Sequence, residues 1–123
     1  MVDEIEKALT ELTVSGGGSY RAALVFGGGF TGFKGHFPGN PVLPGVCQIL
    51  VFSVLAERAA GRKLKLGGIP RAKFLSVIEP GERAEFRFSL AEKDGVFVLA
   101  GETSSESKGT VGKFKLVFGV RNV

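Results

Sequence analysis

Apolar residues gather in one long run near the middle of the chain. Within residues 46–56 only Gln48 and Ser53 are clearly polar. This run predicts one helix over residues 44–60, with Gly61 as the residue that ends it. Because a helix that is apolar on nearly every side must be buried on nearly every side, we expect it to lie at the centre of the molecule, with its remaining exposed surface covered by a second subunit.

The second half of the chain has the alternation typical of β-strands. We expect strands over 66–77, 83–90 and 96–102, and a further one that contains Phe114, Leu116 and Phe118. The tripeptide Lys93-Asp94-Gly95 predicts a type I′ hairpin turn, because Asp-Gly supplies the positive φ values that this turn needs. A loose turn is expected over 104–109. Strands joined by successive hairpins are antiparallel.

The first part of the chain is ambiguous. Within residues 3–14 the apolar positions fit a helix at Ile5 and Leu9 and a strand at Leu12 and Val14. Residues 15–18 form a glycine-rich turn, and the alternation after it predicts a hairpin that leads into the sheet. Neither this glycine cluster nor the one at 27–29 resembles a phosphate-binding loop, because no G-K-[ST] follows and no helix opens after either.

The composition of the chain limits the class of protein to which it can belong. The 123 residues predict one domain spanning 1–123, and with one cysteine and one histidine we expect no intramolecular disulfide, no metal site and no cofactor. The first residues are acidic and lack an apolar core, so we expect no signal peptide. The apolar run is shorter than the ~20 residues that span a bilayer. We therefore expect a cytoplasmic protein with no membrane contact.

Residues 35–48 form the most distinctive segment and read G-H-F-P-G-N-P-V-L-P-G-V-C-Q. It holds the only histidine of the chain, His36, and three of the five prolines, at every third position. Prolines fix φ and restrict the residue before them, so the segment is expected to be rigid. It leads into the predicted helix, where the first backbone N–H groups are free. A titratable imidazole here suggests a functional site, although a lone histidine fits a packed structural residue equally well.

This segment resembles the signature of the 3-hydroxyacyl-[acyl-carrier-protein] dehydratases, which reads G-H-F-P-x-x-P-x-x-P-G-V. A second block, G-I-P-R-A-K-F at 68–74 with P-G-E at 80–82, is similar to another conserved strand and turn of that family. The two blocks span about 33–82. The resemblance implies an α+β hotdog fold, in which an antiparallel sheet wraps round one long central helix. It also implies a homodimer or a higher oligomer.

The resemblance further implies the loss of water from a 3-hydroxyacyl thioester of acyl-carrier protein or coenzyme A, as in fatty-acid metabolism. His36 would be the base that removes the α-proton, because its pKa lies near neutrality. The backbone N–H groups of Gly45 and Val46 would bind the thioester oxygen. Phe37, Pro44 and Gln48 would line the substrate site.

One part of the family pattern is missing. The family places an acidic residue fourteen positions after the histidine, and here that position is Leu50. Glu57 lies two turns further along the helix, ~10 Å away, which is too far for a direct proton transfer. Gln48 could orient a water or a substrate oxygen. Cys47 is more typical of a small buried residue than of a nucleophile.

Three hypotheses therefore stay open. The chain is a dehydratase-type lyase that works with a water or a remote acid, a binding subunit that keeps the acyl-thioester site without catalysis, or half of a heterodimer whose related partner supplies the carboxylate. A thioesterase is a weaker fourth hypothesis, because no carboxylate lies near the helix start to activate water. The hotdog fold alone does not decide between these chemistries.

The net charge of +4 is modest, but basic residues cluster between positions 58 and 73. They are Arg58, Arg62, Lys63, Lys65, Arg71 and Lys73. Such a cluster is most often a solvated surface near a helix end. As a docking surface it would suit acyl-carrier protein. Nucleic acid is disfavoured, since no aromatic residues interleave with the basic ones.

Overall fold

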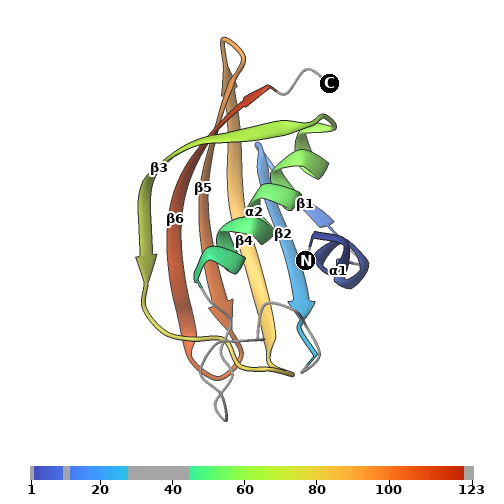
Figure 1. The fold of residues 1–123 in the computed structure, drawn as a ribbon, viewed down its shortest axis with the longest axis vertical. Helices are drawn as coiled ribbons and strands as arrows, with labels where there is room; N and C mark the ends of the chain where they lie inside the picture. Colours follow the sequence, from blue (N-terminus) through green and yellow to red (C-terminus); the bar gives the residue numbers. More distant parts are fainter. Residues whose placement is uncertain (1, 10–11, 28–44, 121–123) are drawn as a thin grey trace.

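A computed structural model describes residues 2–9, 12–27 and 45–120 of the chain. Six strands form one antiparallel sheet in the order β1-β2-β4-β5-β6-β3, and the long helix α2 crosses one face of it (Figure 1). The elements are α1 (Val2–Ala8), β1 (Leu12–Gly16), β2 (Ser19–Val25), α2 (Gly45–Ala60), β3 (Leu64–Phe74), β4 (Arg83–Lys93), β5 (Val96–Ser105) and β6 (Gly109–Val120). The predicted α+β arrangement of an antiparallel sheet round one long helix is confirmed.

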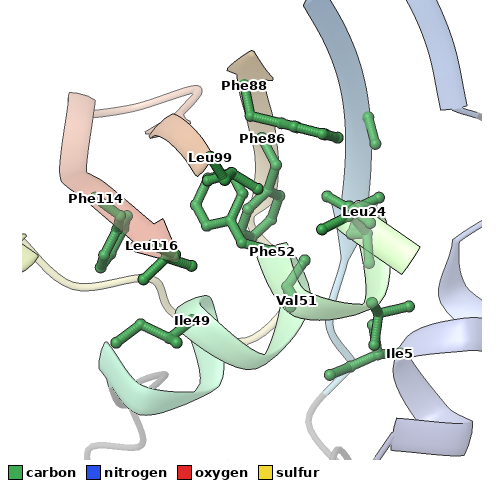
Figure 2. Close-up of a cluster of buried hydrophobic side chains, with 14 of the residues drawn as sticks. Ile5, Leu24, Ile49, Val51, Phe52, Phe86, Phe88, Leu99, Phe114 and Leu116 are labelled. Atoms are coloured by element: carbon green, nitrogen blue, oxygen red, sulfur yellow. The ribbon is translucent and has the colours of Figure 1, made fainter. Parts of the chain in front are cut away.

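Helix α2 is buried as its composition predicts. Its buried residues are Cys47, Gln48, Ile49, Val51, Phe52, Val54, Leu55 and Ala56. Figure 2 shows Phe52 inserted among side chains of the sheet, where it meets Phe86 edge to face with ring centroids 5.3 Å apart. The helix ends as predicted at Gly61, which has a φ of 70° and donates its N–H to the Glu57 carbonyl at 2.9 Å.

The ambiguous first segment forms both of the elements that its pattern allowed. Residues 2–8 form α1, and β1 begins at Leu12. Ile5 is fully buried, and α1, which carries it, packs against α2 (Figure 2). Helix α1 therefore covers part of the α2 surface that we had expected only a second subunit to cover.

The strand bounds differ from the predicted ones where long-range contacts decide them. Strand β3 ends three residues before the predicted position 77, because the N–H groups of Leu75 and Ser76 both approach the Val111 carbonyl, at 2.8 and 3.2 Å, and the ladder register ends at Phe74. Strands β4 and β5 extend to Lys93 and Ser105, beyond the predicted ends. Between them Asp94 and Gly95 have φ values of 52° and 78°, as a type I′ turn requires.

The turn before β4 is held by the carboxylate of Glu82. This group accepts hydrogen bonds from the Glu79 N–H at 3.1 Å and the Ser107 hydroxyl at 2.5 Å, and lies 3.7 Å from the Lys108 ammonium. Burial raises the pKa of Glu82, but the hydrogen bonds, with a smaller contribution from Lys108, outweigh it and lower that pKa to about 2. The P-G-E block therefore ties this turn to the β5–β6 hairpin.

Within the described ranges, neither helix combines the length and the apolar character that crossing a membrane would require.

Candidate functional site

The candidate site lies where α2 begins. Of the residues that the sequence predicts for it, Gly45, Val46, Gln48 and Leu50 are described, whereas His36, Phe37 and Pro44 lie outside the described residues. Val46 is 69% exposed. The first N–H groups of an α-helix have no partner inside the helix, and they carry the positive end of its dipole. The start of α2 therefore offers donors to an oxygen that becomes negative.

Strand β3 closes on the first turn of α2 through an aromatic ring. A Cβ added to Gly45 would lie 2.6 Å from both Cδ1 and Cζ of Phe74, so only glycine allows this approach. The ring of Phe74 also packs against Phe114, with centroids 5.5 Å apart, yet Phe74 remains 53% exposed. One side of the helix start is therefore an apolar edge that faces solvent in the single chain.

Successive turns of α2 contact successive strands. Gly45 meets β3 at Phe74, Gln48 meets β6 at Gly112, and Phe52 meets β5 at Gly101. These three helix positions are spaced by three and four residues, so they share one face of the helix. The two strand glycines leave room for these larger helix side chains. A Cβ added to Gly101 would lie 2.7 Å from Phe52 Cε1, and a Cβ added to Gly112 would lie 2.8 Å from Gln48 Oε1.

Gln48 is the polar member of this face, and it is 1% exposed. Its Oε1 atom is buried without a hydrogen-bond partner among the described residues. The same holds for the Oγ1 atom of Thr103, a residue with no exposed surface. Thr103 pairs with Gly112 across β5 and β6, and Gly112 is the residue that Gln48 contacts. Two unpaired polar atoms therefore lie over neighbouring positions of the sheet.

Sequence reasoning missed Thr103, although a signal was present. The inward positions of β5 alternate through Phe97, Leu99 and Gly101, and Thr103 follows them in the same period. A hydroxyl-bearing residue at an otherwise apolar inward position is the feature that would have indicated it. Its closeness to Gln48 depends on the β5–β6 register.

No carboxylate of α2 lies near its start. Leu50 is partly buried and packs against the hydrophobic core. Glu57, the only acidic residue of α2, accepts the N–H of Leu64 on its Oε2 at 2.9 Å and so holds the start of β3. The described part of the chain contains no group of three or more His, Cys, Asp or Glu residues that could hold a metal ion.

Cys47 is buried, as predicted, at 2% exposure. Burial raises the pKa of its thiol, so the thiol stays protonated at neutral pH. The side chain therefore belongs to the core and is not an activated nucleophile.

A large groove lies elsewhere, on the face of the sheet opposite α2. It has a volume of about 890 Å³, and its lining includes Arg71, Arg87, Lys113 and Lys115. Arg87 lies 3.4 Å from Glu85 and 4.0 Å from Glu102, whereas the other three cations form no ion pair within the described residues. Of the predicted basic cluster, Arg71 lines this groove, and Lys73 pairs with Lys113 in the ladder beside it.

Similar proteins place the chain among known families. The family model of ApeI-like proteins, described as ApeI dehydratase, matches residues 14–110, which is more than half of the chain. Two curated relatives are 3-hydroxyacyl-[acyl-carrier-protein] dehydratases named FabZ. The one from Sulfurimonas denitrificans is 37% identical over 84 residues, covering 57% of this chain and 56% of the relative. The one from Latilactobacillus sakei is 39% identical over 77 residues, covering 54% and 53%. The chain thus spans about half the length of these relatives.

Solved structures agree on the fold. The dehydratase heterocomplex ApeI:P from Xenorhabdus doucetiae contains a chain that matches with a TM-score of 0.79 at 22% identity, over 90% of this chain and 96% of that one. A thioesterase from Haemophilus influenzae matches with a TM-score of 0.68 at 16% identity, over 94% and 81%. The predicted hotdog fold is confirmed, and the chain belongs to the ApeI-like dehydratase family.

Proposed function

We propose that this chain takes part in the dehydration of a 3-hydroxyacyl thioester carried by acyl-carrier protein or coenzyme A. The observation that carries the proposal is the buried, unpaired polar pair of Gln48 and Thr103 close to the first turn of α2. The histidine-bearing signature leads directly to that point in the sequence. The names of the relatives, which are 3-hydroxyacyl-[acyl-carrier-protein] dehydratases, support the same chemistry.

In this mechanism the imidazole of His36 removes the α-proton of the acyl chain. The charge that develops on the thioester oxygen is stabilised by the N–H groups of Gly45 and Val46, which the helix dipole makes better donors. The electrons of the broken C–H bond form the double bond, and the 3-hydroxyl group leaves as water after it is protonated.

The proton donor for that last step is the open part of the mechanism. Leu50 occupies the position of the family's acid, and Glu57 already binds the start of β3. We infer that the acid comes from another polypeptide in a heterodimer. A homodimer, which the family resemblance also allows, would carry leucine at both sites.

The exposed edge beside the site supports an assembly. Strand β3 lies at the end of the sheet, and Ile69, Phe74 and Leu75 on or just after it are 47%, 53% and 47% exposed. Exposed apolar side chains along an edge strand are typical of a surface that pairs with another chain. The chain of similar fold from Xenorhabdus doucetiae is itself part of a dehydratase heterocomplex.

The test is a turnover assay on 3-hydroxyacyl thioesters with the chain alone and mixed with a related, carboxylate-bearing chain. We expect no turnover alone and turnover in the mixture, lost when His36 is replaced by alanine in this chain. Turnover by the chain alone would instead favour an enzyme that uses a water or a remote acid. Binding without turnover in every mixture would favour the non-catalytic subunit. If the chain neither binds nor converts acyl thioesters, the proposal is wrong.

A docking surface for acyl-carrier protein is a further part of the proposal. The groove opposite α2 gathers cations from β3, β4 and β6, and a basic surface attracts an acidic carrier protein. The helix-end residues Arg58, Arg62 and Lys63 are exposed as well. A coenzyme A thioester needs no docked protein. Comparing its turnover with that of the carrier-protein thioester therefore distinguishes an effect on docking from an effect on the chemical step.

A further inference from the structure

Gln48 and Thr103 are the only side chains in the described part of the chain that have a fully buried oxygen or nitrogen atom without a hydrogen-bond partner. A buried polar atom left without a partner costs free energy, so native proteins rarely keep one unless a ligand or a water completes it. Here two such atoms come from different elements, α2 and β5, and both belong to residues at the Thr103–Gly112 pair of the β5–β6 ladder. This placement suggests a site for one small polar group.

The fold brings these residues together through Gly112. Thr103 and Gly112 are direct partners in the β5–β6 ladder, so their Cα atoms are ~5 Å apart and their Cβ directions share one face. Gln48 Oε1 lies 2.8 Å from the point where a Cβ of Gly112 would be. The missing side chain of Gly112 therefore leaves the space that the carboxamide of Gln48 occupies, next to the ladder partner of Gly112, Thr103.

The hydrogen-bonding capacity of the pair defines the group that it fits. The Oε1 atom of Gln48 only accepts hydrogen bonds, whereas the hydroxyl of Thr103 can donate one. A hydroxyl group satisfies both, because it donates its hydrogen to Gln48 and accepts the hydrogen of Thr103. In the orientation that the carboxamide has here, a ketone oxygen leaves Oε1 unpaired, and a methylene group pairs with neither Gln48 nor Thr103.

We propose that Gln48 and Thr103 bind the 3-hydroxyl group of the acyl substrate and select 3-hydroxyacyl chains over 3-oxoacyl and saturated ones. This inference rests on the proposed function, since it names what that site recognises. Neither residue changes its protonation state, so both are specificity-determining residues that orient the leaving group. A site built to pair with a substrate hydroxyl discriminates strongly against analogues without it, because its own buried groups are then left unpaired.

The test measures binding, so that it does not depend on turnover. The probes are three pantetheine amides of one chain length, with a 3-hydroxyacyl, a 3-oxoacyl and a saturated acyl group, titrated calorimetrically into the purified full chain. An amide in place of the thioester keeps the carbonyl oxygen and resists reaction. We expect the 3-hydroxyacyl amide to bind about tenfold more tightly than either of the others, as one to two neutral hydrogen bonds allow.

Thr103→Val keeps the shape of the side chain and removes the hydroxyl, so we expect it to reduce the preference for the 3-hydroxyacyl amide about fivefold or more. The affinity for the saturated amide should stay within about twofold. Gln48→Met should act in the same direction. Thr103→Ser restores the hydroxyl and should keep the preference. Thr110→Val is the matched control, because the Thr110 hydroxyl already donates to Glu102 at 2.7 Å.

The outcomes separate the two proposals. Equal binding of the three amides to the unmodified chain, or a preference unchanged by both Thr103→Val and Gln48→Met, overturns this inference and leaves the proposed function standing. A lowered melting temperature with equal loss of all three affinities in Thr103→Val also overturns it, because a structural water would explain that result. If the unmodified chain binds none of the amides, the proposed function itself is wrong.

Discussion

Replacing Gly112 by alanine tests the packing on which the candidate site depends. The added Cβ would lie 2.8 Å from Gln48 Oε1, 2.8 Å from Phe114 Cε2 and 3.0 Å from Phe114 Cζ. These separations are shorter than a carbon atom tolerates, so a neighbour must move. Phe114 is 3% exposed and lies between the rings of Phe52 and Phe74, each with a centroid distance of 5.5 Å. The aromatic ring therefore has little room, and the carboxamide of Gln48 must shift.

The expected loss in the free energy of unfolding follows from this overpacking. Inserting a methyl group into a well-packed core costs about 1–3 kcal/mol. Gly119 on the same strand gives a matched control, because a Cβ there would meet nothing within 4 Å and its φ is not positive. Gly119→Ala should be neutral or stabilise by up to about 1 kcal/mol, since alanine lowers the entropy of the unfolded chain.

Urea unfolding, followed by circular dichroism, measures the free energy of unfolding of both variants. The two values are compared only if the slope of this free energy against urea concentration is the same for both. The double variant Gly112→Ala/Gln48→Ala removes one of the two clashes, so its loss should be smaller than the sum of the single losses by about 0.5–2 kcal/mol. If Gly112→Ala and Gly119→Ala have the same stability, or if the two changes are additive, the contact between α2 and β6 is not as described and the inferred hydroxyl site loses its basis.

Three further predictions concern other parts of the molecule. Leu50→Glu should restore or raise dehydration in a turnover assay if the acid is the only missing group. Because its carboxylate lies in a partly apolar position, the variant should also lose about 1–3 kcal/mol in the free energy of unfolding. A folded variant with no gain in turnover would contradict this prediction. Glu82→Gln should cost about 1–2 kcal/mol at pH 7 after screening. Because the folded pKa of Glu82 is about 2 against an ordinary 4.5, this difference should vanish as pH falls from 4.5 to 2 in urea titrations; a difference independent of pH would refute it. In the mixture with the carboxylate-bearing chain, Lys113→Glu/Lys115→Glu should slow turnover of the carrier-protein substrate and leave turnover of the coenzyme A substrate unchanged. Equal slowing of both would exclude docking in the groove.

Local patterns were sufficient for several elements. The apolar run predicted α2 over all of its described residues, Gly45–Ala60, and Gly61 ended it because glycine adopts a positive φ without strain. The Asp94-Gly95 turn and the inward row of β4 followed from equally local rules. The family signature at 35–46 is also local. It predicted the hotdog fold and the dehydratase family, which the fold and the similar proteins confirm.

Other features depend on residues far apart in the sequence. The helix α1 forms where the pattern was ambiguous, and its Ile5 is buried beside α2, an element some forty positions later. Strand β3 ends early because Leu75 and Ser76 reach the carbonyl of Val111. Neither contact can be predicted from the hydrophobic periodicity of its own segment. This periodicity indicates which residues are buried, but not which residues they contact.

The same division applies to the candidate site. The sequence by itself placed Gly45, Val46, Gln48 and Leu50 on one helix and showed that its acid is missing. Thr103 came only from the tertiary structure, because the β5–β6 register sets it opposite Gly112, and the fold sets Gln48 over that glycine. A hydrogen-bonding site built from two elements requires both positions in space, and a strand's register is decided by pairing along its whole length.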